Sequence, residues 1–150
     1  MVTKQRRDPE EARALDTYVK LMRATESVTA RAHRRLSNFG LTLSQFGVLE
    51  ALYHLGPMSQ GEIGQKILRT SGNMTMVIDN LEKRNLVRRE RNREDRRFFI
   101  VQLTGEGKKL ISSLFPSQAA EIKKELEVLT PAQQRTLGKL CKKLGLQGRR

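Results

Sequence analysis

The spacing of apolar residues predicts a chain made mostly of helices. In the first forty residues, Leu15, Val19 and Met22 recur at intervals of three to four positions, which is the repeat of one helix face. We expect one long helix over 10–38 that ends just before Gly40, a residue suited to the left-handed turn that follows many helices. Its apolar residues cover only one side, so this helix is amphipathic.

Three further helix starts are indicated by a Ser or Thr followed, three positions later, by Glu or Gln. This capping-box spacing follows Thr42, Ser59 and Thr130. Gly56-Pro57 ends the first of these helices. The last is predicted over 131–144, with a proline in its first turn.

The middle of the chain predicts a helix-turn-helix. A short helix after Ser59 is followed by a polar turn over 69–72 and by a second helix over about 71–84. Val77, Ile78 and Leu81 mark the buried face of this second helix, which precedes Asn85. Two short helices joined by such a turn form a helix-turn-helix.

A β-hairpin is predicted next. The runs 86–91 and 98–103 contain β-forming residues, and the segment between them is polar and charged. We expect a wing over about 88–99, followed from Thr104 by a long helix broken or bent near Pro116. The predicted fold class is therefore mainly α with a small β-hairpin wing, a winged helix-turn-helix.

The two ends of the chain carry more apolar surface than one winged helix can cover. We expect a single domain over 1–150, with 42–104 as the winged-helix part and with 10–38 and 117–146 as dimerisation helices. A two-fold symmetric homodimer would bury the surplus.

The charge of the hairpin indicates a polyanionic partner. Between Lys83 and Arg97 there are eight basic residues and three acidic ones, a net charge of +5, and the whole chain carries +13. Such a concentration of charge favours a phosphate backbone. The chain has no Trp, and few aromatic residues are available to stack on bases, which favours duplex DNA over single-stranded RNA. The alternative is a basic RNA-associated or nucleoid-associated protein without sequence-specific readout.

Several other classes are disfavoured by what the sequence lacks. No apolar run reaches the ~20 residues needed to span a bilayer, and no signal peptide is evident, so we expect a cytoplasmic protein with no membrane partner. Cys141 is the single cysteine, and we expect it to be a packed thiol. No motif for catalysis, a metal or a cofactor is present, so we expect neither an enzyme nor a cofactor.

Three motifs carry a resemblance to a known family. Asp95, Arg97, Leu103 and Thr104 fit the pattern D-x-R-x-x-x-x-x-L-T, residues 41–52 fit L-T-x-x-Q-F-x-V-L-x-x-L, and residues 79–87 fit D-x-L-E-x-x-x-L-V. With these motifs the chain resembles the MarR family of bacterial transcriptional regulators from about Leu15 to Leu144.

The resemblance implies a homodimer bound to a pseudo-palindromic DNA operator. The helix over 71–84 would enter the major groove and the wing the adjacent minor groove, where Arg97 is the contact and Asp95 orients it. A guanidinium also suits the negative potential of a narrow minor groove. The expected DNA-binding residues are Ser59, Gln60, Arg69, Ser71, Asn73, Thr75, Met76, Asn80, Lys83, Arg93, Asp95, Arg96 and Arg97.

The resemblance also implies a repressor that a small aromatic effector releases from DNA. A run over 53–67 is similar to that of family members that respond to quinones and catechols. A phenol or quinone would suit apolar walls with a few polar groups. The candidate pocket residues are Met22, His33, Phe46, Tyr53, His54 and Phe115, each of which can equally be an ordinary core or surface residue.

Overall fold

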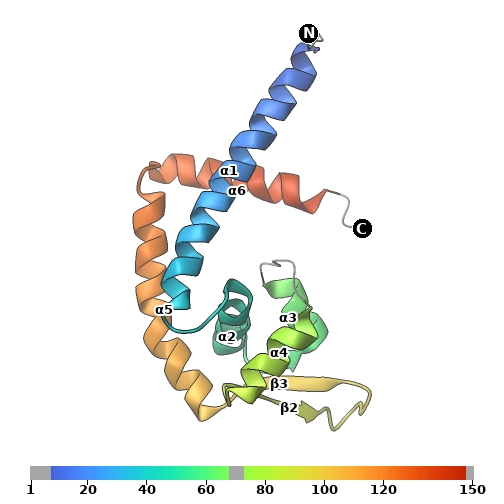
Figure 1. Ribbon diagram of the computed structural model, residues 1–150. Coiled ribbons are helices and arrows are strands. Elements are labelled where there is room, and N and C mark those ends of the chain that lie inside the picture. The colour runs from blue at the N-terminus through green and yellow to red at the C-terminus, as the bar shows by residue number, and fades with distance from the viewer. Residues whose placement is uncertain (1–7, 68–72, 148–150) are drawn as a thin grey trace, which may run out of the picture. The chain divides into compact units, whose positions relative to one another are not determined.

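The computed structural model describes residues 8–67 and 73–147 and divides into two compact units, one ending at Lys108 and one beginning at Lys109. The first unit holds four helices and a small antiparallel sheet, and the second holds most of α5 and all of α6, so the predicted fold class is confirmed (Figure 1). The elements are α1 (Pro9–Ser37), α2 (Leu43–Leu55), β1 (Met58–Ser59), α3 (Gln60–Lys66), α4 (Met74–Lys83), β2 (Val87–Arg91), β3 (Phe99–Leu103), α5 (Gly105–Leu126) and α6 (Pro131–Leu146).

The helix starts follow the predicted capping residues. Thr42 and Thr130 form complete capping boxes: the threonine hydroxyl accepts from the backbone N–H of the glutamine three residues on, and the side-chain oxygen of that glutamine accepts from the threonine N–H. Ser59 also caps its helix, because its hydroxyl accepts from the Glu62 N–H. In this case the Ser59 hydroxyl itself donates to the Glu62 carboxylate at 3.1 Å.

α4 is shorter than the helix predicted over about 71–84. α4 begins at Met74, where the Asn73 side chain accepts the Thr75 N–H at 2.9 Å, and residues 71 and 72 of the predicted helix lie outside the described residues. α4 ends at Lys83 with Arg84 as its C-cap, just before Asn85 as expected, and the φ of Asn85, 58°, is left-handed. The Leu86 N–H bonds to the Leu81 carbonyl across this turn, a Schellman closure.

The wing belongs to a sheet of three strands in the order β1-β3-β2. β2 and β3 form the predicted hairpin, with Arg89 opposite Val101 and Arg91 opposite Phe99. β1 adds a strand that the sequence did not predict, with Met58 opposite Val101. A strand of two residues exists only through its partner, so it has no local signature.

The core of the first unit is formed where α2, α3, α4 and the sheet meet (Figure 1). The N-terminal part of α1 contributes little, because Leu15, Val19 and Met22 are all exposed. The largest fully buried side chains among the described residues of this unit are Leu36, Leu41, Val48, Leu49, Ile63, Ile78, Leu81, Val87 and Val101.

The second unit corrects two expectations. A break or a bend was expected near Pro116, and α5 runs through Pro116 as one helix, so it is not broken there. No residue of α6 is buried, and the Cys141 thiol, expected to be packed, is exposed. Within the described ranges, no helix is long and apolar enough to cross a membrane.

Candidate nucleic-acid interface

The exposed side of α4 presents one continuous stripe of predicted contact residues. Asn73, Met76, Asn80 and Lys83 are all exposed and recur at intervals of three or four, so they share a helix face. Met76 is 61% exposed, so its apolar side chain is open to contact. The opposite face of α4 holds the buried Ile78 and Leu81, so the stripe is directed away from the core.

The wing carries an arginine held in a defined orientation. Arg97 donates from Nε to Asp95 Oδ1 at 3.0 Å and from Nη2 to Asp95 Oδ2 at 2.8 Å, and its backbone N–H bonds to the same carboxylate. The Arg97 side chain is 83% exposed. The carboxylate engages two of the five guanidinium N–H groups, so the other three remain available to an acceptor outside the protein.

The pair shifts both ionisation equilibria. The side-chain hydrogen bonds from Arg97, followed by its backbone N–H, lower the pKa of the Asp95 carboxyl below its ordinary value of 3.8. The Asp95 carboxylate in turn raises the pKa of Arg97. Because the folded-state pKa of Asp95 is the lower one, the pair stabilises the folded wing above pH 3.8, and this contribution is lost as the pH falls through the folded-state pKa.

This coupling gives a pH prediction. An NMR titration that follows the Asp95 carboxyl carbon should have its midpoint below 3.8, and in Arg97→Gln the midpoint should rise toward 3.8. The reason is that glutamine cannot supply the charged bidentate partner. A midpoint that is the same in both proteins would show that the pair is not formed in solution.

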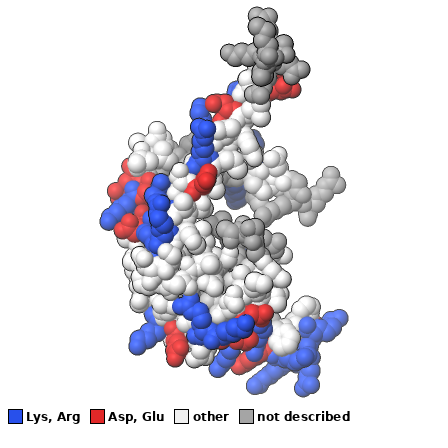
Figure 2. All heavy atoms as spheres, in the orientation of Figure 1, with Lys and Arg blue, Asp and Glu red and all other residues white. Residues whose placement is uncertain are grey.

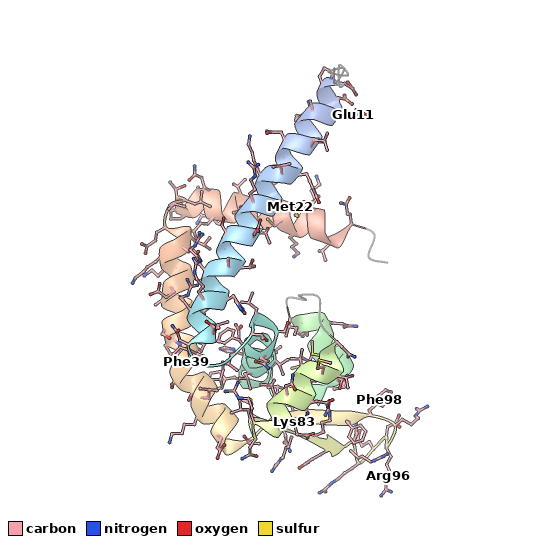
Figure 3. The ribbon with its side chains drawn as sticks, viewed as in Figure 1. Glu11, Met22, Phe39, Lys83, Arg96 and Phe98 are labelled. Atoms are coloured by element: carbon pink, nitrogen blue, oxygen red, sulfur yellow. The ribbon has the colours of Figure 1, made fainter. Side chains whose placement is uncertain are left out.

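The other cations of the wing fall into two groups. Arg93 and Arg96 are exposed, and neither side chain forms an ion pair with another described residue. Arg91 instead donates to the Arg96 carbonyl at 2.9 Å and lies 5.0 Å from the centre of the Phe99 ring. Basic side chains gather over the wing, where Arg96 extends from its far end (Figures 2 and 3).

Two basic residues of the charged stretch are structural rather than free. Arg84 donates to the carbonyls of Gly40 at 2.7 Å and Phe39 at 3.3 Å. Arg89 is only 17% exposed and pairs with Asp79 on α4. The sequence interpretation counted both as part of a cationic surface. Strand alternation could have identified Arg89, because it lies two positions after the buried Val87 and therefore on the same face of β2.

The remaining predicted contacts of the helix-turn-helix lie near α3. Ser59 and Gln60 are half-buried at its start, and the Gln60 amide Nε2 donates to the Thr75 hydroxyl at 2.7 Å. This bond joins α3 to the first turn of α4. The predicted contacts Arg69 and Ser71 lie outside the described residues.

The candidate effector residues are distributed over several elements. Met22 and His33 are exposed on α1, and Phe46 is 7% exposed in the core on α2. Tyr53 and His54 are exposed near the end of α2, with their rings edge to face and centroids 5.1 Å apart. Phe115, half-buried, belongs to the second unit.

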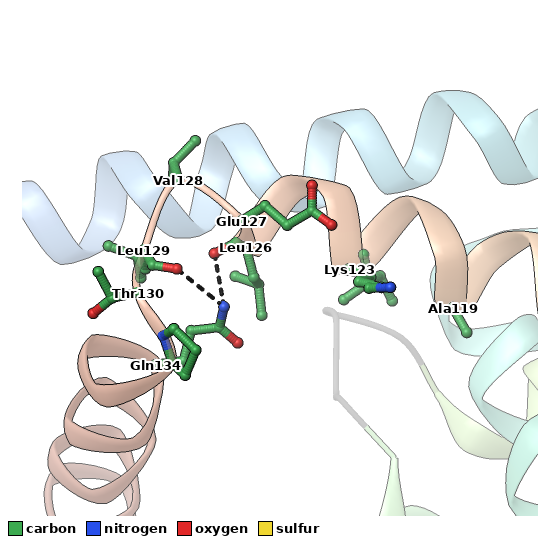
Figure 4. A pocket seen from close by; sticks show the side chains of 10 residues that line it. Ala119, Lys123, Leu126, Glu127, Val128, Leu129, Thr130 and Gln134 are labelled. Carbon is green, nitrogen blue, oxygen red and sulfur yellow. Dashed lines mark hydrogen bonds between the residues drawn. The ribbon is translucent and has the colours of Figure 1, made fainter.

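A groove that the sequence did not predict lies where α5 turns into α6, within the second unit (Figure 4). Its volume is about 670 Å³. Gln134 donates to the carbonyls of Leu126 at 3.0 Å and Leu129 at 3.2 Å, which holds the turn closed (Figure 4). None of the six candidate effector residues lines it. In the part of the chain that the structure describes, no group of three metal-ligating side chains occurs.

Comparison with known proteins identifies the family. The MarR family model matches residues 41–98. The HTH-type transcriptional regulator MhqR of Bacillus subtilis (strain 168) is 34% identical over 137 residues, which cover 91% of this chain and 94% of MhqR.

Two solved structures of regulators match most of the chain. Bordetella bronchiseptica BpsR, whose DNA binding is regulated by 6-hydroxynicotinic acid, matches with a TM-score of 0.76 at 27% identity, over 87% of this chain and 98% of BpsR. MepR of S. aureus, in its DNA-binding conformation, matches with a TM-score of 0.71 at 26% identity, over 85% of this chain and 95% of MepR. The chain belongs to the MarR family of DNA-binding transcriptional regulators.

Proposed function

We propose that this protein is a homodimeric repressor that binds a pseudo-palindromic operator and releases it when a small aromatic effector binds. The observation that carries the proposal is the combination, in one unit, of the exposed α4 stripe with a wing whose Arg97 is oriented by Asp95. In this proposal α4 enters the major groove and the wing the adjacent minor groove.

The side chains of each element suit the groove assigned to it. Asn73 and Asn80 can pair with an adenine edge, the Met76 side chain can contact a thymine methyl, and Lys83 can reach a phosphate. On the wing, Arg97 has three N–H groups left for acceptors in the minor groove. Arg93 and Arg96 add charge that a phosphate backbone would neutralise.

The exposed apolar residues support a dimer. On α1, Leu15, Val19 and Met22 are 39–45% exposed, and on α6, Leu137 and Leu140 are 44% and 59% exposed. Contiguous apolar faces of this kind are rarely left in water. A second copy that covers them would set two α4 helices about one DNA turn, ~34 Å, apart.

The dimer can be tested by placing a charge in the apolar face of α6. We expect Leu140→Glu to be monomeric by light scattering at micromolar concentration, and to bind operator about 100-fold more weakly because the second half-site is no longer held by the same molecule. Lys142→Glu, on the opposite side of α6, should remain dimeric. A stable Leu140→Glu dimer would place the interface elsewhere.

The effector proposal rests on the family and on chemistry. The DNA binding of BpsR is regulated by an aromatic acid. The run over 53–67 is similar to that of family members that respond to quinones and catechols, and a phenol would also suit apolar walls with a few polar groups. Of the six candidates, Tyr53 and His54 offer an exposed aromatic face with polar atoms. A thermal-shift screen with aromatic acids, phenols and quinones, followed by DNA release, identifies the class.

A competition titration tests the function as a whole. Operators are first selected from a pool of random duplexes, and the labelled operator is then challenged with bulk DNA and with RNA. A sequence-specific regulator should prefer its operator by ~10³ or more. Equal binding to all competitors would instead support the RNA-associated or nucleoid-associated alternative.

A further inference from the structure

Arg89 joins the wing to both helices of the helix-turn-helix. Its Nη1 pairs with Asp79 at 2.5 Å and with Glu82 at 3.3 Å, one turn apart on α4. Its Nη2 donates to the Thr75 carbonyl at 3.3 Å and to the Gln60 Oε1, on α3, at 3.5 Å. The two carboxylates hold the guanidinium in place. The positive charge beside Gln60 and Thr75 is therefore fixed in position.

This arrangement sets the polarity of the Gln60 amide. A guanidinium can only donate, so the amide oxygen must face Arg89, and the amide nitrogen then faces Thr75. Gln60 Nε2 accordingly donates to Thr75 Oγ1 at 2.7 Å. The reverse orientation would put the amide N–H groups against a cation.

The orientation of the Gln60 amide also decides the role of the Thr75 hydroxyl. Its hydroxyl oxygen accepts from Gln60, and no acceptor within the described residues takes its hydrogen. Gln60 Nε2 has a second N–H as well. The junction of α3 and α4 therefore offers adjacent hydrogen-bond donors, from Thr75 and Gln60, beside the exposed face of α4.

We propose that Arg89 is a positioning residue that makes Gln60 and Thr75 a donor pair for the major-groove edge of guanine. Guanine presents two acceptors there, N7 and O6, whereas adenine and cytosine present an amino donor. This inference rests on the proposed DNA-binding function and adds a base preference to it. Arg89 acts through the other two residues and does not itself touch DNA.

The test uses the selected operator with single half-site guanines replaced by 7-deazaguanine, which lacks the N7 acceptor. Wild-type protein should lose about fivefold to tenfold in affinity at one symmetric pair of guanines, the scale of one hydrogen bond to a base. Arg89→Lys keeps the charge but cannot hold both carboxylates and Gln60, so it should bind the normal and substituted operators with nearly equal affinity.

Controls separate positioning from folding. Arg88→Lys, on the outer face of β2 and 60% exposed, should behave as wild type. Gln60→Met leaves the Arg89 ion pairs in place and should lose the same discrimination, and adding Arg89→Lys should cause no further loss because both act through one contact. The far-UV circular dichroism spectrum should stay unchanged in each variant, which a general loss of structure would not permit.

The outcomes distinguish the two proposals. If wild-type protein selects no operator, the proposed function fails. If it selects an operator but no guanine substitution weakens binding, or if Arg89→Lys and Gln60→Met keep the full discrimination, the operator-binding function stands and the positioning role of Arg89 is wrong.

Discussion

Arg97→Ala is expected to weaken operator binding by about 10-fold to 100-fold, the range for a specific arginine contact. The variant removes the three free N–H donors of the guanidinium and leaves the Asp95 carboxylate, 33% exposed, without its partner. An unpaired carboxylate facing the minor groove would repel DNA. A fluorescence-anisotropy titration at several salt concentrations should also show a slope of log affinity against log salt that is smaller by about one.

Two variants control this result. Arg135→Ala removes the same charge at an exposed position of α6 and should change affinity less than twofold, because it acts only through net charge. Asp95→Asn keeps the side-chain size but weakens the pair, so its effect should lie between those of wild type and Arg97→Ala. Operator affinity unchanged in Arg97→Ala would remove the wing from the mechanism.

Gly107→Ala is expected to lower the free energy of unfolding by about 1–3 kcal/mol, the usual cost of overpacking. Gly107 lies in the first turn of α5, and a β-carbon there would overlap the Leu86 carbonyl, lying 2.9 Å from its carbon. The obstacle is backbone that is itself bonded to the Thr104 N–H at 3.1 Å, so it cannot move freely. Urea denaturation without DNA measures the change.

The matched control lies in the same helix turn. A β-carbon at Gly105 would have no atom within 4 Å. Alanine inside a helix is more stable than glycine by roughly 0.5–1 kcal/mol. Gly105→Ala should therefore be neutral or slightly stabilising. If both variants proved equally stable, the close approach of α5 to the end of α4 would not exist in solution.

The close approach also explains part of the family motif. Thr104 Oγ1 donates to the Asn85 carbonyl at 2.6 Å and accepts from the Gly107 N–H at 3.0 Å. A threonine and a glycine three residues apart thus fasten the start of α5 to the turn after α4. Thr104 was noted in the sequence only as the last residue of a pattern, and the structure supplies the physical reason for a threonine there.

Local signals predicted most of the fold. Capping residues such as Thr42 and Thr130 act within one helix turn, so their spacing alone located two helix starts. The two-residue β1 was missed because it depends on pairing with β3, some forty residues away. A break was one of the two outcomes expected at Pro116, and α5 continues through it because local propensity was overridden within the helix.

In the candidate site, too, the features that depend on local sequence were predicted, and those that depend on distant contacts were not. The exposed α4 stripe followed from helix periodicity, and the Asp95–Arg97 pair was expected from the family resemblance. The Arg89 side chain points toward α4 because Asp79 and Glu82 lie beside β2. A count of basic residues cannot distinguish such a paired arginine from an exposed one. The groove at the turn between α5 and α6 likewise depends on how two helices meet.

The central claim is that two copies of this chain hold one duplex through paired helices and paired wings. Hydroxyl-radical footprinting on the selected operator tests it most directly, because the radical attacks from the minor groove, where the wings are proposed to lie. At a protein concentration that just saturates the operator with wild type, the account predicts two symmetric protected segments, related by the two-fold axis of the operator, that both fade in Arg97→Ala. A single protected segment, or uniform protection that Arg97→Ala leaves intact, would contradict it.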